Sequence, residues 1–277
     1  MGAGPPVPRA VHGRGRAPGR GVSGRGRGMS LLEGRSAVVT GAGDIGRVVA
    51  QRLHDHGASV EVWDASAAAL SRVEAGGIGV REVDVTDRDA VTAAATSAAA
   101  VGPVSVLANT AAVARFGSVA DLDPDHWQET LDVNLTGVYL CCRAFVGPMA
   151  ATGGGSIVNI SSIGGLKGEP DFASYCASKF GVIGLTQSLA REVGSSNIRV
   201  NAVCPGAVES QMNTDTMARD ARRYGITLED VEQRILSRTA LGRLVQPGDV
   251  ADAVVFLASD LSSCITAESL AVTGGIF

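Results

Sequence analysis

The chain has 277 residues, of which 45% are hydrophobic and only 4% aromatic, with a formal net charge of −4. This length allows one large α/β domain with a core of Ala, Val, Leu and Ile, and no apolar stretch reaches the roughly 20 residues of a membrane span. The five cysteines show no CxxC spacing, which argues against a zinc or other metal site and against a disulfide framework. We therefore expect a cytoplasmic protein that holds no metal and does not bind a membrane.

Residues 1–28 differ from the rest in composition: they are rich in Gly and Pro and contain six arginines and no acidic residue. We expect this segment to be a disordered extension. It could be an RNA-binding arm or a start-site extension ahead of Met29, and we favour the extension. The six arginines leave a net charge of −10 on residues 29–277, so nucleic acid is not expected as a partner of the single domain predicted there.

From Ser36 onward, short apolar strands alternate with helical patterns. Strands are predicted at Ser36–Thr40, Ser59–Trp63, within Gly79–Val85, and at Val104–Asn109, Ser156–Ser161, Ile198–Val203 and Ser269–Thr273. Helices are predicted at Ile45–His56, Asp87–Val101, Asp125–Ala151 and Ser174–Val193. This alternation is typical of a Rossmann-like, doubly wound α/β fold: a mostly parallel seven-stranded sheet with helices on both faces and ligands at the carboxyl ends of its strands.

A glycine-rich segment joins the first strand to the first helix. Gly41, Gly43 and Gly46 form G-x-G-x-x-G, a pattern that lets backbone approach a pyrophosphate at a helix N-terminus. Asp64 ends the second strand, where an acid holds ribose hydroxyls and repels a 2′-phosphate. Asp44 also stands where a basic residue could bind that phosphate, so both acids favour NAD over NADP. Asp64 could instead cap the segment that begins near Ser66.

Tyr175 and Lys179 are four residues apart on a predicted helix and therefore share one face. An ammonium beside a phenol favours the phenolate and lowers its pKa toward neutrality, which suits acid/base catalysis. Ser162 lies thirteen residues upstream, where its hydroxyl could hold a substrate oxygen or serve turn chemistry. Asn134 lies inside a long predicted helix, where it could hold a water, open the helix, or be a tolerated core residue.

Several motifs in one order resemble the short-chain dehydrogenase/reductase family, in its compact single-domain branch. They are TGAGDIG (Thr40–Gly46), the acid of VEVWD, VDV (Val83–Val85), DVNLTG, NISS, YCASK and NAVCPG (Asn201–Gly206), and the resemblance runs from about Leu32 to Gly275. It implies Tyr175 as general acid/base, Ser162 as the residue that orients the carbonyl, Lys179 as a ribose ligand, and Asn134 as the anchor of a water.

The resemblance also implies a cofactor cleft and a homotetramer. The implied cofactor-binding residues are Gly41, Gly43, Asp44, Ile45, Gly46, Asp64, Asp84, Val85, Asn109, Tyr175, Lys179, Pro205, Gly206, Val208 and Ser210. The chain departs from the family pattern in a glycine loop one residue short, in Thr110-Ala111-Ala112 after Asn109, in Thr273 and in Ala267. The shorter loop bears on pyrophosphate geometry, and none of these departures removes a reacting group.

Residues 207–246 are the expected substrate lid, read as two helices broken at Gly225, with Thr227 as the N-cap of the second. Three arginines cluster on its first helix: Arg219, Arg222 and Arg223. They could attract an anionic substrate, but we favour a solvated face paired with nearby acids.

We therefore expect an NAD-dependent oxidoreductase that interconverts a small secondary alcohol and a ketone. One alternative is a 3-oxoacyl-thioester reductase, against which Asp64 counts, because that role usually uses NADPH. The other is a cofactor-binding regulator with little turnover, which the intact set of reacting groups opposes.

Overall fold

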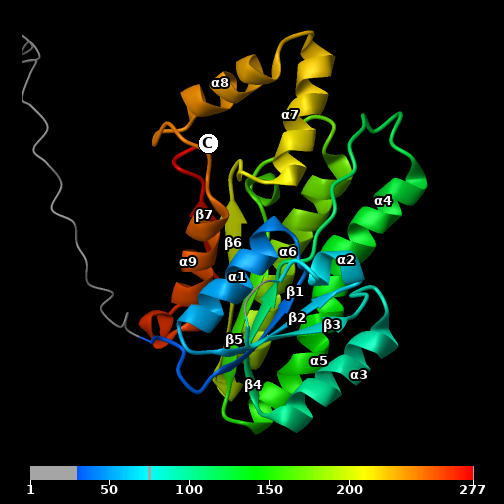
Figure 1. The fold of residues 1–277 in the computed structure, drawn as a ribbon. Coiled ribbons are helices and arrows are strands. Elements are labelled where there is room, and N and C mark those ends of the chain that lie inside the picture. Colours follow the sequence, from blue (N-terminus) through cyan, green and yellow to red (C-terminus); the bar gives the residue numbers. More distant parts are fainter. Residues whose placement is uncertain (1–29, 74–75, 277) are drawn as a thin grey trace, which may run out of the picture.

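The computed structural model describes residues 30–73 and 76–276, so the disorder expected for residues 1–28 lies outside the described part. Within it, seven parallel strands form one sheet in the order β3-β2-β1-β4-β5-β6-β7. Their bounds are β1 Ser36–Thr40, β2 Ser59–Asp64, β3 Ile78–Glu82, β4 Val104–Asn109, β5 Gly155–Ile160, β6 Ile198–Pro205 and β7 Ser269–Val272. The doubly wound fold predicted from the sequence is confirmed (Figure 1).

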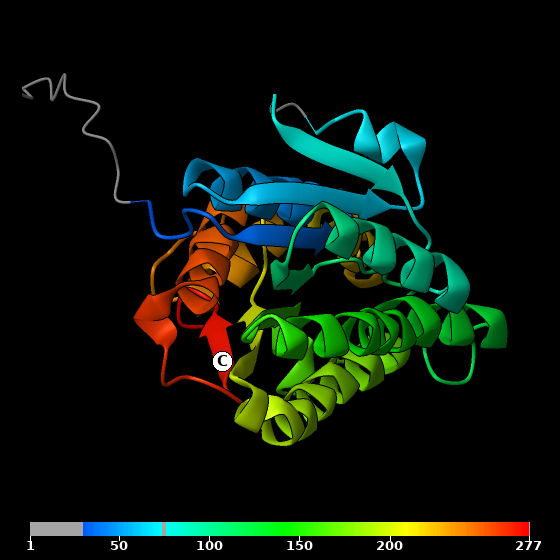
Figure 2. The same ribbon diagram turned by 90° about the horizontal axis from the view of Figure 1, so that it is seen from below.

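Helices cover both faces of this sheet, as Figure 2 shows. Their bounds are α1 Asp44–Asp55, α2 Ala67–Leu70, α3 Arg88–Val101, α4 Pro124–Leu131, α5 Gly137–Ala151, α6 Ala173–Val193, α7 Gln211–Tyr224, α8 Leu228–Arg238 and α9 Pro247–Ala258. α1 packs with α9 on one face, while α3, α5 and α6 pack on the other. None of the helices in the described ranges is long and apolar enough to cross a membrane.

Alternation along the strands divides the core between the two faces. In β1, Val39 packs into the layer of α1 and α9, while its neighbour Val38 packs into the opposite layer against α5. Both side chains are almost completely buried. Successive strand residues point to opposite faces, so a strand covered by helices on both faces has apolar residues at consecutive positions. This continuous apolar run is the pattern from which the strand was predicted.

Two helical features differ from the sequence prediction. The segment expected as one helix over Asp125–Ala151 consists of α4 and α5 joined by a π-helical turn at Asp132–Thr136. α9 was not predicted, although Pro247 at its first position is a common helix start. The pattern of α9 is nearly all apolar because one side packs on the sheet and another on α1.

Residues 207–246, the segment expected as a substrate lid, contain the break expected at Gly225. Gly225 ends α7 in the left-handed conformation (φ 63°), and α8 begins at a capping box in which Thr227 and Asp230 exchange hydrogen bonds. α7 and α8 extend beyond the carboxyl ends of the strands (Figure 1). They cover the side of the sheet where doubly wound folds bind ligands.

Candidate active site

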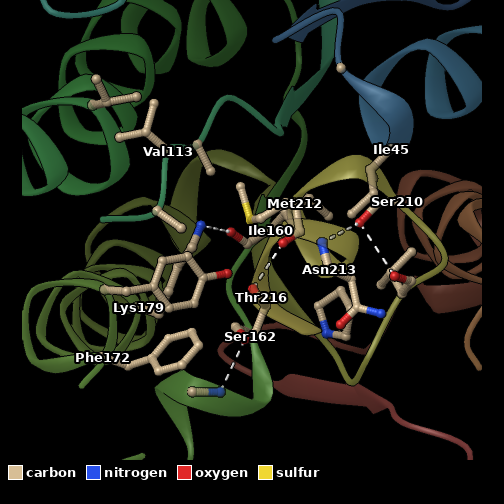
Figure 3. Close-up of a pocket in the computed structure, with 18 of the residues that line it drawn as sticks. Ile45, Val113, Ile160, Ser162, Phe172, Lys179, Ser210, Met212, Asn213 and Thr216 are labelled. Atoms are coloured by element: carbon tan, nitrogen blue, oxygen red, sulfur yellow. Dashed lines mark hydrogen bonds between the residues drawn. The ribbon is translucent and has the colours of Figure 1, made fainter. Parts of the chain in front are cut away.

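A cavity of about 1300 Å³ opens at the carboxyl ends of the strands, between the glycine loop and the lid. Figure 3 shows Phe172 and Lys179 on one side of it and Ser210 and Asn213 of the lid segment on the other. The volume exceeds the usual range for a drug-sized ligand and is sufficient for a dinucleotide with a small substrate. Across residues 30–73 and 76–276, no group of three or more His, Cys, Asp or Glu side chains could hold a metal ion.

The glycine loop is shaped for close backbone approach. A Cβ on Gly46 would lie 1.9 Å from the carbonyl oxygen of Gly41, and Gly41 itself has φ +87°, so both positions require glycine. A Cβ on Gly43 would meet nothing within 4 Å in the described chain, so this residue faces open space at the start of α1. No described side chain caps α1, which leaves its first N–H groups to bind an anion. These residues fit the pyrophosphate of a dinucleotide.

Asp44 links the glycine loop to the lid. It is the first residue of α1, and its Oδ2 accepts the backbone N–H of Gln211 at 2.7 Å, at the first position of α7. Its other oxygen lies 3.5 Å from the Arg47 guanidinium, a weak contact. The carboxylate therefore lies at the helix end where the pyrophosphate is expected, and it adds negative charge there. Ile45 follows it on the cavity wall (Figure 3).

Replacing Asp44 with asparagine should tighten NADH binding. The amide oxygen can still accept the Gln211 N–H, while one negative charge beside the pyrophosphate is lost. Two like charges a few ångströms apart repel by about 1 kcal/mol in a water-rich setting, equivalent to roughly fivefold in Kd. Fluorescence titration with NADH measures this, with Asp55→Asn at the other end of α1 as the control. Unchanged or weaker binding in Asp44→Asn would contradict this account of the loop.

Asp64 lies at the cavity end of β2 with its carboxylate held in place. Oδ2 accepts the N–H of Ala42 at 2.7 Å, and Oδ1 accepts the N–H of Ser66 at 2.8 Å. Each carboxylate oxygen can accept a further hydrogen bond, so the side chain can still receive ribose hydroxyls. The alternative that Asp64 caps the following helix is wrong, because the N-cap of α2 is Ser66, whose hydroxyl accepts the N–H of Ala69 at 3.2 Å.

Most of the other expected cofactor residues line the same cavity: Asp84, Val85, Pro205, Gly206, Val208 and Ser210. Asn109 does not. Its side chain is buried beneath the cavity, where Nδ2 donates to Asn159 Oδ1 at 2.8 Å, and Thr110 takes the place on the wall. Asn109 is the last residue of β4 and pairs in register with Asn159 of β5, and its Nδ2 also lies 3.5 Å from Cys142 Sγ. The side chain therefore points into the layer of α5.

Tyr175 and Lys179 meet at the cavity, one turn apart on α6. The Lys179 Nζ lies 5.6 Å from the centroid of the Tyr175 ring and donates to the carbonyl oxygen of Ile160 at 2.9 Å. Ser162 follows β5 and lines the same wall, and its hydroxyl accepts the N–H of Gly164 at 3.0 Å. An α-helix and the end of a neighbouring strand thus bring the three expected reacting groups together.

Burial governs the protonation of this pair. Burial lowers the pKa of Lys179 from its ordinary 10.5 to about 8, and the side chain is only 1% exposed. Burial also raises the pKa of Tyr175, an effect that the Ser162 hydroxyl partly opposes. The sequence predicted the opposite direction for the tyrosine. The cause is that the phenolate loses more hydration in this enclosed site than its neighbours restore.

Asn134 does not face the cavity. It is completely buried, and its amide pairs with the backbone of Val113, accepting the N–H at 2.8 Å and donating to the carbonyl at 2.9 Å. Nδ2 also donates to Ser178 Oγ at 3.1 Å. The helix is opened locally at this residue, as the sequence suggested, because Asn134 lies in the π-helical turn. Through these bonds Asn134 positions Val113, which lines the cavity.

Sequence reasoning missed several residues of the cavity wall, chiefly Phe116, Phe172 and Asn213. Arg219 was expected on a solvated face, yet its side chain is only 19% exposed and lies against two aromatic rings. The charged composition of α7 hides this inward face. A signal was present in the spacing of residues 212, 216, 219 and 223, which share one side of a helix.

Comparisons with known proteins agree with this geometry. Residues 41–276 match the family model described as enoyl-(acyl carrier protein) reductase. The chain belongs to the short-chain dehydrogenase/reductase family. It is 35% identical to the 3-oxoacyl-[acyl-carrier-protein] reductase FabG of Chlamydia muridarum, over 89% of this chain and 99% of that protein. It is 40% identical to galactitol 2-dehydrogenase (L-tagatose-forming) of Cereibacter sphaeroides, over 88% and 95%.

Among solved structures, NAD+-bound xylitol dehydrogenase superposes with a TM-score of 0.85 at 30% identity, covering 88% of this chain and 99% of that one. The family binds nicotinamide cofactors, and the relatives named above are oxidoreductases of alcohols or ketones. The short-chain dehydrogenase/reductase found here is therefore an alcohol/ketone oxidoreductase of that general kind.

Proposed function

We propose that this dehydrogenase is an NAD(H)-dependent enzyme that interconverts a secondary alcohol and a ketone, with Tyr175 as the general acid/base. The observation that carries the proposal is the position of Lys179 Nζ, 5.6 Å from the Tyr175 ring, on the wall of the cavity that also contains the glycine loop. A hydride donor, an acid and an oxygen-binding hydroxyl are the parts that carbonyl reduction needs. The buried, free thiols of Cys141, Cys142 and Cys204 are consistent with the cytoplasmic location that we propose.

The roles of the reacting residues follow from their chemistry. A bound nicotinamide would supply or accept the hydride at the substrate carbon. Tyr175 donates its phenolic proton to the substrate oxygen in reduction and takes it back in oxidation. The Ser162 hydroxyl donates a hydrogen bond to the same oxygen and so fixes its orientation. The Lys179 ammonium binds the nicotinamide ribose and favours the phenolate that forms during the cycle.

We propose NAD rather than NADP on the strength of Asp64. A fixed carboxylate at the end of β2 accepts hydrogen bonds from two ribose hydroxyls and repels a phosphate in the same place. Asp64→Ala should weaken NADH binding by about tenfold or more, because hydrogen bonds to a charged acceptor contribute about 1.5–3 kcal/mol each. It should also raise the affinity for NADPH relative to NADH.

The measurement is fluorescence titration of both cofactors with wild type, Asp64→Ala and Asp64→Asn. The asparagine variant keeps an acceptor for the Ala42 N–H and separates the lost charge from a disturbed loop. A wild-type protein that binds NADPH more tightly than NADH would refute the preference, and it would favour the 3-oxoacyl-thioester reductase as the second candidate.

We further propose that the enzyme is a homotetramer. Three aromatic side chains are exposed on neighbouring helices: Trp127 of α4, Tyr139 of α5 and Phe180 of α6. Exposed apolar surface of this kind marks association sites. Light scattering should give a tetramer, and Phe180→Glu should yield smaller species, whereas Val101→Glu at the exposed end of α3 should not. A stable wild-type monomer at micromolar concentration would refute the proposal.

A further inference from the structure

Arg219 of the lid helix α7 lies against two aromatic rings. The centre of its guanidinium lies 4.7 Å from the centroid of the Phe116 ring and 4.4 Å from that of Phe172. The two rings meet edge to face at 4.8 Å. Contact with aromatic faces stabilises the cation and fixes the plane of its donors. The guanidinium is therefore held at the cavity wall by both rings.

One edge of this guanidinium is left without a partner. Nε and Nη2 both donate to Asp220 Oδ1, at 3.0 and 2.5 Å. Nη1 is buried and has no hydrogen-bond partner within the described residues. An unsatisfied buried donor costs about 1–3 kcal/mol, more for a charged group, and a native structure keeps one where it serves a purpose. Arg219 lines the cavity, so a small shift of its side chain would present this donor to an acceptor there.

Two of the other basic side chains on the cavity wall have acidic partners, and a third does not. Arg223 pairs with Asp171, and Lys167 pairs with Glu169 at 3.3 Å. Arg238 at the end of α8 lines the same cavity, and it forms no ion pair with any residue of 30–73 or 76–276. The cavity wall also carries Asp125 and Asp132, which form no ion pair with a described residue, so the free donor of Arg219, and not the net charge of the wall, favours an anion.

Phe172 connects this end of the cavity to the reacting groups. Its ring contacts the Arg219 guanidinium on one side and lies 6.1 Å from the Tyr175 ring on the other. A substrate with its carbonyl at Tyr175 therefore passes along an apolar ring before it reaches Nη1. Such a path fits a short hydrocarbon chain between two oxygen functions.

We propose that Arg219 binds a carboxylate at the far end of the substrate, so that the substrate is a hydroxy or oxo acid. This inference rests on the alcohol/ketone chemistry proposed above. It makes Arg219 the residue that selects an acid over a neutral alcohol of the same shape, while the residues that exchange hydride and proton stay the same.

The test measures binding in complexes that cannot react. Calorimetry measures the affinity of NAD+-saturated protein for three oxo acids: 4-oxopentanoate, 5-oxohexanoate and 6-oxoheptanoate. Their ketone groups cannot accept a hydride from oxidised cofactor, so no reaction occurs. Each acid is compared with its methyl ester and with the ketone in which an isopropyl group replaces the carboxylate. At least one acid should bind about tenfold or more tightly than its isopropyl counterpart, the value of a charged hydrogen bond.

Arg219→Met should remove that preference while leaving the affinity for NAD+ unchanged, and Arg219→Lys should retain part of it as a point charge. Arg222→Met, on the exposed side of the same helix, is the matched control and should behave as wild type. Circular dichroism checks that each variant is folded. If Arg219→Met does not fold, the Arg219→Lys variant still tests the proposal.

Three results would overturn the inference: equal affinity for acid and isopropyl ketone in wild type, an ester that binds as well as its acid, or an Arg219→Met protein that keeps the preference. Failure of all the compounds to bind to NAD+-loaded protein would overturn it too. Failure of NAD+ itself to bind refutes the proposed function instead, so the two failures are distinguishable.

Discussion

Replacing Tyr175 with phenylalanine should lower kcat by a factor of about 10² to 10⁴, the usual contribution of a positioned acid or base. Carbonyl reduction places negative charge on the substrate oxygen, and a proton must reach it. Phenylalanine keeps the ring packed against Phe172 and beside Lys179 and removes only the hydroxyl. The affinity for NADH should therefore stay within about twofold of wild type, a difference below 0.5 kcal/mol.

Steady-state kinetics and NADH fluorescence titration measure the two effects separately. Tyr139→Phe is the matched control, because it removes the hydroxyl of an exposed tyrosine on α5, far along the chain from the reacting groups. A Tyr175→Phe enzyme with near wild-type turnover would show that the proton comes from another group.

Replacing Lys179 with methionine should abolish most activity and at the same time stabilise the fold. The side chain is almost completely buried, and burial lowers its pKa from 10.5 to about 8. Holding it charged at pH 7 therefore costs the folded state about 3 kcal/mol relative to the unfolded chain. Methionine has a similar length and no charge, but it forfeits the hydrogen bond to the Ile160 carbonyl. A net stabilisation of about 2 kcal/mol should remain.

The difference in stability between wild type and Lys179→Met should depend on pH. Below pH 8 both the folded and the unfolded chain keep the lysine protonated, and the full cost is present. Between pH 8 and 10.5 only the unfolded chain binds this proton, so the stability of wild type relative to Lys179→Met rises with pH. The advantage of the variant should thus be largest near neutrality and shrink as the pH approaches 10.5.

Denaturant unfolding of both proteins from pH 7 to 10 measures this difference. The control is Lys167→Met, which removes the other lysine of the chain, a half-exposed side chain paired with Glu169. Its effect on stability should stay below about 1 kcal/mol, because surface ion pairs contribute little. A Lys179→Met protein that is less stable than wild type at pH 7 would contradict the account of the buried ammonium.

The two variants together separate what the site does from what the fold requires. Tyr175 is tested as a proton donor that can be removed without loss of packing. Lys179 is tested as a charge whose burial opposes stability, which is expected where a charge is retained for function.

Local patterns in the sequence were enough to predict the fold and much of the site. The alternation of apolar strands with helices predicts a parallel sheet, and a parallel sheet brings the ends of β1, β2, β5 and β6 to one edge. Gly41 and Gly46 come soon after β1, and Asp64 ends β2, so the sequence places all three residues at that edge. Tyr175 and Lys179 are four residues apart on one helix, so their proximity needs no information beyond the helical repeat.

Only the tertiary structure decided the features that depend on residues distant in the chain. Asn109 turns away from the cavity because Asn159 of the next strand receives its amide, and Asn134 binds the backbone of Val113, 21 residues earlier in the chain. Arg219 faces inward because Phe116, about a hundred residues earlier, lies against it. The pKa of Tyr175 rises rather than falls because the residues packed around its ring, from several elements, remove water from the hydroxyl. Helical and strand periodicity report which side of an element is apolar, whereas partner, burial and protonation are set by packing between elements.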